Sequence, residues 1–221
     1  MSRIVLKVGG AVAGEASTLA LALAERHEVC VVHGAGPQIS AELERAGLEV
    51  RFVHGRRVTS REALAVVRGS LAAVNAGICA AIGPQAVPLF GDEIGLDAVG
   101  VPELGHVGSP LPSSPAAIEA ALEAGLVPVV APLGVGPLNV NADEAAAALA
   151  VGLDADKLLF LTDVPGLLLG GVVASRIGVA EAERLLAAGV FGGGIVPKLE
   201  AAVKAARGGV DATIGATAVV A

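Results

Sequence analysis

Glycine-rich loops stand between apolar strands and helices at three points of this chain, and this arrangement limits the fold most. Ile4–Val8 is an apolar, β-branched run followed by Gly9-Gly10, and Glu28–Val32 is a second such run followed by His33–Pro37. Nearer the C-terminus, 192–194 is a glycine triplet that leads into a helix beginning near Pro197. Runs of this kind are buried in parallel sheets, whose strands are joined by helices. The sequence therefore predicts an α/β fold.

A lysine accompanies the first and the last of these loops. Lys7 precedes the first glycine pair, and Lys198 follows the triplet. An edge lysine can simply extend its ammonium into water. Glycine loops at helix N-termini, however, bring backbone N–H groups close to an anion. Because the pattern recurs, we favour two cations aimed at a bound phosphate. Neither a dinucleotide motif nor a P-loop is present, so the sequence suggests phosphoryl transfer without a P-loop.

A polar corner precedes the Ala-rich helix that ends near Ala150. Asn141 suits the N-cap, and Asp143 in the first turn is favoured by the positive end of the helix dipole. Capping alone would explain these two residues. Asn139, two positions before Asn141, points to the same side of an extended segment as Asn141 and has no capping role there. The corner is therefore interpreted as a polar site.

Length, composition and charge restrict the class of protein. A chain of 221 residues that is 54% hydrophobic can form one domain over 1–221. The longest uncharged runs, 69–91 and 124–142, are interrupted by Pro, Gly, Asn or Gln, so neither offers ~20 continuous apolar residues. With no spanning helix and no secretion signal expected, we predict a cytoplasmic protein. A net charge of -7 with no basic run argues against nucleic acid.

Two further features concern thiols and self-association. Cys30 and Cys79 are expected to be buried free thiols and not a disulfide or metal pair, and no metal site made by the protein is predicted.

A capping box at Thr59–Glu62 opens a helix that reaches Ile82 and is apolar nearly all round. A helix of this type is covered on both sides. Deep burial is one explanation, but we favour a homodimer through the helix from Thr59 to Ile82.

Seven segments together resemble the amino-acid kinase family, and most closely its acetylglutamate kinases. They span nearly the whole chain and occur in the family's order: Lys7-Val8-Gly9-Gly10, His33-Gly34-Ala35-Gly36, Gly55-Arg56-Arg57-Val58-Thr59, Leu104-Gly105-His106-Val107-Gly108, Asn139-Val140-Asn141-Ala142-Asp143, Thr162-Asp163-Val164-Pro165-Gly166 and Gly194-Ile195-Val196-Pro197-Lys198. The resemblance implies a three-layer αβα sandwich with a mainly parallel central sheet. It also implies an N-terminal half for the acyl substrate and a C-terminal half for the nucleotide.

The same resemblance implies roles for individual residues. Lys7 and Lys198 would stabilise the transferring phosphoryl group, and Asp143 would hold both lysines. The acceptor side would comprise Gly9, Gly10, Ala35 and Gly36 as backbone donors, Arg57 and Asn139 at the α-carboxylate, and Asn141. The segment 104–108, expected to be a hairpin or flap outside the core, would close over the acceptor. Thr162, Asp163, Gly166 and Gly194 would border the nucleotide.

The implied reaction is ATP-dependent phosphorylation of the side-chain carboxylate of N-acetyl-L-glutamate in arginine biosynthesis, with Mg²⁺ accompanying ATP. A carboxylate acceptor is already ionised at neutral pH, so no general base is needed. The alternatives are a kinase acting on a glutamate or aminoadipate linked to a carrier protein, a carbamate or phosphate-acceptor kinase, and a non-catalytic relative that binds ligand. Two departures stand out: Ala35 replaces a frequent glycine, and the segment after Ala212 is shorter than usual.

Overall fold

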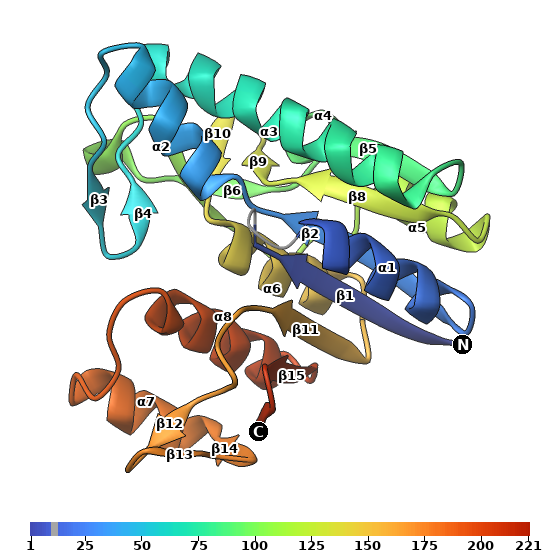
Figure 1. The fold of residues 1–221 in the computed structure, drawn as a ribbon, viewed down its shortest axis with the longest axis vertical. Helices are drawn as coiled ribbons and strands as arrows, with labels where there is room; N and C mark the ends of the chain where they lie inside the picture. Colours follow the sequence, from blue (N-terminus) through green and yellow to red (C-terminus); the bar gives the residue numbers. More distant parts are fainter. Residues whose placement is uncertain (10–12) are drawn as a thin grey trace.

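A mostly parallel sheet forms the centre of the molecule (Figure 1). The computed structural model describes residues 1–9 and 13–221. Within this part of the chain the sheet has eight strands, in the order β14 (Arg176–Gly178), β16 (Thr217–Val220), β15 (Asp211–Ile214), β11 (Lys157–Leu161), β1 (Ser2–Val8), β2 (His27–His33), β8 (Val127–Ala131) and β5 (Ala86–Phe90). Pairing is parallel between all neighbours except β15 and β16. The predicted mainly parallel sheet is confirmed.

Helices cover both faces of this sheet, and successive residues of β1 show the division. Val5 belongs to the apolar core formed with α5 (Ala116–Glu123), α6 (Ala142–Gly152) and α8 (Ile195–Arg207). Leu6 belongs to the opposite core, formed with α1 (Ala13–Ala24) and α3 (Arg61–Ile82). Alternation of side chains along a strand produces such a split. The three-layer αβα sandwich is therefore confirmed.

The two halves of the chain lie at opposite ends of the molecule (Figure 1). Elements from α2 (Gly36–Arg45) to α5 occupy one end, while α8, α7 (Val179–Ala187) and the strands β14 to β16 occupy the other. β1 and β11 pair side by side between them. The sheet order thus brings the carboxyl end of β1 to the boundary between the halves.

Smaller sheets project from this frame. One holds β6 (Ala98–Gly100), β7 (Val107–Pro110), β10 (Leu138–Val140) and β9 (Leu133–Gly134), beside α4 (Gly91–Ile94) and a 3-10 turn at Pro102–Leu104. The others are the hairpins β3 (Phe52–Val53) with β4 (Arg56–Arg57), and β12 (Leu168–Leu169) with β13 (Val172–Val173). A hairpin was expected around 104–108, and β6 and β7 do pair antiparallel. The expectation that it lies outside the core was wrong, because Leu104 and Val107 are buried.

Helix α3 begins two residues later than expected. Ser60 is the N-cap, and its hydroxyl accepts a hydrogen bond from Ala63 N at 3.1 Å. Thr59 is instead fully buried before the helix, where its backbone N–H bonds to Leu104 O. By length and composition alone α3 could cross a membrane, a test that core helices also pass. Here Asn75 fastens it to the sheet by donating to Val129 O at 2.9 Å.

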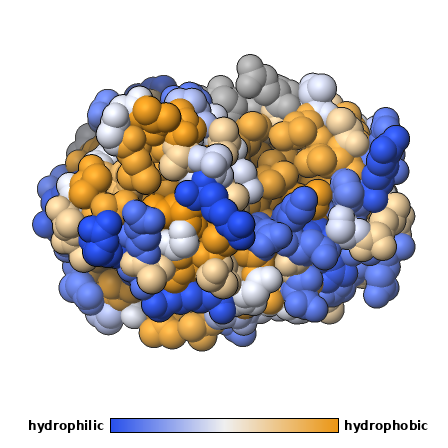
Figure 2. Space-filling model, turned by 90° about the horizontal axis from the view of Figure 1, so that it is seen from below, coloured by the Kyte–Doolittle hydropathy of each residue, from blue (hydrophilic) through white to orange (hydrophobic). Residues whose placement is uncertain are grey.

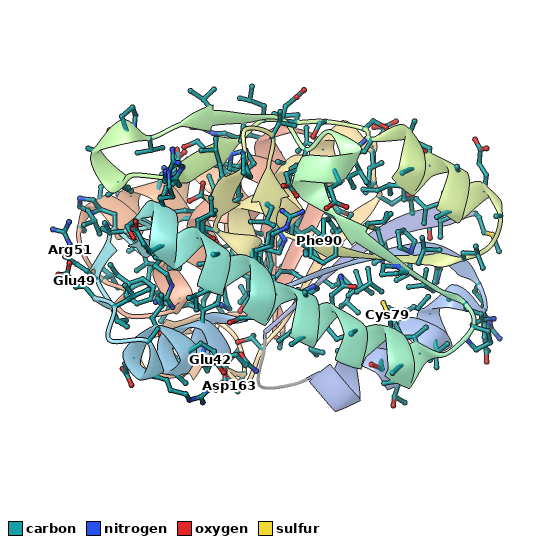
Figure 3. The ribbon with its side chains drawn as sticks, turned by 90° about the horizontal axis from the view of Figure 1, so that it is seen from above. Glu42, Glu49, Arg51, Cys79, Phe90 and Asp163 are labelled. Carbon is teal, nitrogen blue, oxygen red and sulfur yellow. The ribbon has the colours of Figure 1, made fainter. Side chains whose placement is uncertain are left out.

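One face of α3 is not covered by the other elements of residues 1–9 and 13–221. Its inner face packs on the sheet, α1 and α2 through Val67, Leu71 and Ile78. Figure 3 shows the helix lying across the front of the view, with nothing in front of it. After the first turn, with its exposed Arg61 and Glu62, the exposed positions are small residues: Ala65, Gly69, Ala73, Ala76, Gly77, Ala80 and Ala81. The sequence predicted cover on both sides of this helix, and the described part of the chain supplies it on one side.

Candidate active site

A pocket of about 320 Å³ lies where β1 and β2 end and the polar corner before α6 meets them. Loops and a helix N-terminus converge there because the carboxyl ends of parallel strands share one edge of the sheet. Ten of the residues singled out from the sequence line it: Lys7, Gly9, Ala35, Gly36, Arg57, Asn139, Asn141, Asp143, Gly194 and Lys198. Gly10, predicted beside Gly9, lies outside the described residues.

Two lysines share one carboxylate at the floor of this pocket. Lys7 Nζ lies 2.7 Å from Asp143 Oδ1, and Lys198 Nζ lies 3.5 Å from Asp143 Oδ2. Lys7 and Asp143 are each 5% exposed. Burial lowers the pKa of the Lys7 ammonium from its usual value, an effect that Asp143 opposes and Lys198 reinforces. Because a single carboxylate neutralises only one of two cations, the group keeps a positive charge that suits an anion.

The position of Asp143 follows from how α6 begins. Asn141 is the N-cap, and its Oδ1 accepts from Asp143 N at 2.8 Å and from Glu144 N at 3.3 Å. A carboxylate in the first turn is favoured by the helix dipole. Capping and site formation, weighed as alternatives from the sequence, therefore occur together at this corner.

Arg57 is a buried cation with no carboxylate partner among the described residues. It is 6% exposed, its Nη2 donates to Gly36 O (3.1 Å) and to Ser40 Oγ (2.8 Å), and its guanidinium stacks over Phe52 at 4.5 Å. Its Nη1 has no hydrogen-bond partner within the part of the chain that the structure describes. Burial lowers the pKa of Arg57, and no neighbouring charge offsets the lost hydration. A guanidinium in this state favours binding an anion from outside the chain.

Asn139 lines the same pocket, and two hydrogen bonds connect it through Thr59 to the backbone of Arg57. Its Nδ2 donates to Thr59 Oγ1 at 2.9 Å, and Thr59 Oγ1 donates to Arg57 O at 2.9 Å. The backbone N–H of Asn139 donates to His106 O, directly before β7. This contact could not be predicted, because Asn139 and Thr59 are distant in the chain and a threonine in a capping box suggests a helix start.

An ion pair that the sequence did not predict joins the β3–β4 hairpin to α6. Arg56 Nε and Nη2 donate to Glu144 Oε1 (2.8 Å) and Oε2 (2.7 Å). Paired arginines in a sequence can suggest a bidentate grip on a substrate carboxylate. Arg56 does grip a carboxylate in the bidentate manner, but that carboxylate belongs to the protein.

His33 is held as a neutral side chain at the end of β2. It is fully buried, and the Asn75 amide nitrogen lies 3.1 Å from its Nε2. Burial lowers the pKa of His33 to about 4, against the opposing effect of a hydrogen bond to Gly34. A ring that is neutral at pH 7 and sealed from solvent fits a structural role beside the glycine loop.

A second pocket of about 570 Å³ adjoins the first. It is lined by Thr162, Asp163, Gly166 and Gly194, the four residues assigned to the nucleotide, and by Lys198. Gly166 has φ +147°, and a Cβ there would lie 2.6 Å from Thr217 Oγ1, so the loop requires glycine. Gly194 and Lys198 line both pockets. The two cavities therefore meet at this lysine.

Apolar side chains surround the second pocket. Val164, Leu168, Val190, Phe191 and Ile195 contribute to its lining, and Leu168 and Val190 remain more than half exposed. Figure 2 views the molecule from the end that carries these elements, and apolar residues there alternate with hydrophilic ones. An apolar wall beside a lysine suits a ligand with a flat, weakly polar ring at one end and negative charge at the other.

No protein-held metal cluster is recorded in residues 1–9 and 13–221, where no group of three or more His, Cys, Asp or Glu could hold an ion. Asp143 is already paired with both lysines. The two cysteines are free thiols, and Cys30 is buried as predicted; the predicted burial of Cys79 was wrong, because this residue is partly exposed.

Comparison with characterised sequences identifies the family. The model of the amino acid kinase family matches residues 2–215. An acetylglutamate kinase of Rubrobacter xylanophilus is 44% identical over 224 residues, covering 97% of this chain and 88% of the relative. One from Methanopyrus kandleri is 42% identical, covering 93% of this chain and 91% of the relative.

Solved structures share the fold. A crystal structure from Streptococcus mutans superposes with a TM-score of 0.89 at 29% identity and covers 99% of this chain and 98% of the other. A carbamate kinase from Giardia lamblia bound to AMP-PNP superposes with a TM-score of 0.71 at 15% identity, covering 99% and 98%. With a family match over nearly its whole length and relatives above 40% identity, the chain belongs to the amino acid kinase family.

Proposed function

We propose that this protein transfers the γ-phosphoryl group of ATP to the side-chain carboxylate of N-acetyl-L-glutamate, forming an acyl phosphate in arginine biosynthesis. The observation that carries the proposal is the meeting of two pockets at Lys198, beside the ion-paired Lys7 and Asp143. Its substrate assignment is supported by acetylglutamate kinases at up to 44% identity over most of the chain.

The chemistry asked of the site is electrostatic. Two anions, the acceptor carboxylate and the ATP phosphates, must approach each other, and the developing charge must be neutralised. In our proposal Lys7 and Lys198 do this, and Asp143 fixes both ammonium groups in place. Backbone N–H groups of Gly9, Ala35 and Gly36 surround the phosphoryl group. No side chain need remove a proton, because the acceptor is already a carboxylate.

The acceptor and the nucleotide occupy different halves of the chain in this proposal. Arg57 binds the α-carboxylate through its unpartnered Nη1, while Asn139 and Asn141 border the acceptor. Thr162, Asp163, Gly166 and Gly194 border ATP. Mg²⁺ enters with the nucleotide, held by its phosphates, and supplies further charge neutralisation there. The 1–221 chain acts as one domain, with its N-terminal half facing the acceptor.

The charge pattern favours a free acceptor over a carrier-linked one. A kinase that docks an acidic carrier protein should offer a basic surface, and the net charge here is -7. The arginine pair 56–57 cannot form such a docking surface, because Arg56 is neutralised by Glu144 and Arg57 is buried against Phe52 and Gly36. A small dicarboxylate that enters the pocket remains the better fit.

An ADP-release assay over a panel of acceptors tests the proposed function. We expect turnover with N-acetyl-L-glutamate and far less with L-glutamate, carbamate or inorganic phosphate, since these lack the acyl group or the α-carboxylate. Activity should require both ATP and Mg²⁺. Turnover only with a carrier-linked substrate would replace the free-acceptor assignment, and ATP binding without any turnover would point to a non-catalytic relative.

We also propose a cytoplasmic homodimer that associates through α3. A groove of about 710 Å³ between α2 and α3 is lined by Val66, Gly69, Ala73 and Val74, with charged residues at its edge. Glu42 and Arg45 form an ion pair with each other there, so they leave no net charge at this edge to repel a second copy of the patch approaching about a twofold axis. The small outward residues of α3 would let two helices approach closely.

Lysine substitution at Ala73 or Ala76 is expected to convert the dimer to monomers without unfolding it, because both positions are exposed and helix-compatible. Light scattering coupled to gel filtration would measure the mass. Ala117→Lys on α5, an exposed alanine on the opposite helix layer, is the matched control and should stay dimeric. A dimer that survives both α3 substitutions would place the interface elsewhere.

A further inference from the structure

The β3–β4 hairpin that carries Arg57 has little of its own to hold it in place. Each strand pairs over two residues, and the turn between them uses positive φ at His54 (48°) and Gly55 (74°). Phe52 is 52% exposed. Two-stranded hairpins of this size are marginally stable alone. Its position over the pocket must therefore depend on contacts with other elements.

Three of those contacts involve Arg56 and its neighbours. The guanidinium of Arg56 makes two parallel hydrogen bonds to Glu144 at 2.8 and 2.7 Å, with 21% and 12% of the two side chains exposed. Asn141 Nδ2 donates to Gly55 O at a longer 3.3 Å. Gly55 also faces the ring of Pro197 at the start of α8. The bidentate pair is the strongest of these, since charge-assisted forks exceed neutral contacts in energy and fix orientation.

The first turn of α6 is common to both ends of the pocket. Asp143 holds the lysine pair, and the next residue, Glu144, holds Arg56 of the hairpin. Arg57, adjacent to Arg56, points into the pocket from the other side. One rigid helical turn thus joins the cations for the phosphoryl group to the cation for the α-carboxylate.

We propose that the Arg56–Glu144 pair fixes the separation between Arg57 and the lysine pair and so selects the chain length of the acceptor. The inference rests on the proposed function, because it assumes that Arg57 and the lysines grip opposite ends of one dicarboxylate. Arg56 and Glu144 are positioning residues: Glu144 does not line the pocket, and Arg56 borders it while its guanidinium donates to Glu144. With the separation fixed, an acceptor one methylene shorter or longer cannot reach both groups in a reactive geometry.

The decisive measurement is a ratio of specificities. We compare kcat/KM for N-acetyl-L-glutamate with that for N-acetyl-L-aspartate and N-acetyl-L-2-aminoadipate, which are shorter and longer by one methylene. Arg56→Gln and Glu144→Gln should each reduce the preference for N-acetyl-L-glutamate by about tenfold, within the range that one methylene is worth in a fixed site. A merely structural loss would lower all three activities together and leave the ratio unchanged.

A double-mutant cycle separates the pair from general effects of either residue. The Arg56→Gln/Glu144→Gln variant should lose no more preference than either single variant, because both changes remove one interaction. Arg68→Gln, which breaks the ion pairs of Arg68 with Asp92 and Glu93 at a position that lines neither pocket, should keep the wild-type ratio. Additive losses in the double variant, or ratios unchanged within twofold in both single variants, would overturn the proposal.

Amide hydrogen exchange at residues 52–57, measured without ligand, keeps the test independent of activity. The Arg56→Gln variant should exchange faster there than the wild type or Arg68→Gln, while α6 stays protected. Equal exchange overturns the proposal. An inactive wild type with faster exchange in Arg56→Gln would reject the proposed function but retain the pair as what holds the hairpin. An active wild type, with specificity ratios that stay unchanged in the variants, would retain the proposed function and reject the role of the pair in selecting the acceptor.

Discussion

Replacing Lys7 or Lys198 by methionine is expected to lower kcat by about 100- to 1,000-fold, as removal of one preorganised charge does in other active sites. Methionine keeps an unbranched side chain of similar length and removes the ammonium. Lys198 borders both pockets, and Lys7 lies at the floor of one of them. Either loss would leave the developing charge of the phosphoryl group with one cation where the site holds two.

The comparison is made with both substrates saturating, so that kcat and not binding is measured. Circular dichroism melting checks that the variants fold; this is essential for Lys7, which is 5% exposed and paired with Asp143 at 2.7 Å. Lys204→Met, an exposed position on the same helix as Lys198, is the matched control and should retain wild-type turnover. A folded Lys7 or Lys198 variant with near wild-type kcat would remove that residue from the mechanism.

The lysine arrangement is also where the sequence was most informative. Lys7 could be placed at the end of a strand because the run from Ile4 to Val8 is apolar and β-branched, and buried strands have that composition. The parallel sheet then brings strand ends together, so glycine loops distant in the chain converge on one edge. Asp143 could be located because N-caps have a local signature. Local patterns sufficed wherever the structure follows from short-range rules.

Pairings between distant side chains could not be predicted in this way. Arg56 and Glu144 are 88 positions apart, and no local rule says which carboxylate a given arginine meets. Thr59 shows the same limit: its sequence context suggested a helix cap, yet Ser60 caps α3 and Thr59 bonds to Asn139. The outward face of α3 is a further case, because an apolar sequence does not say whether the cover comes from the same chain or from another.

Arg57→Ala is expected to raise the KM for N-acetyl-L-glutamate by roughly a hundredfold, corresponding to about 3 kcal/mol for a lost charge-assisted contact at a buried site. The KM for ATP should change little, because Arg57 lines the acceptor pocket and not the second pocket. The physical reason is the state of the guanidinium: 6% exposed, without a carboxylate partner among the described residues, and with Nη1 unpartnered. Binding of the α-carboxylate would satisfy that group.

Two companion variants show whether charge or loop support causes the loss. Arg57→Lys retains the charge but not the planar fork, so its KM should lie between those of the wild type and Arg57→Ala. Ser40→Ala removes the 2.8 Å contact that supports Arg57 Nη2 and should raise KM far less. Initial-rate kinetics with each substrate varied in turn give the KM for ATP and the KM for N-acetyl-L-glutamate of each variant. Equal increases in the ATP and acceptor KM of Arg57→Ala, or a Ser40→Ala effect as large as that of Arg57→Ala, would mean that Arg57 supports the glycine loop and does not bind the acceptor.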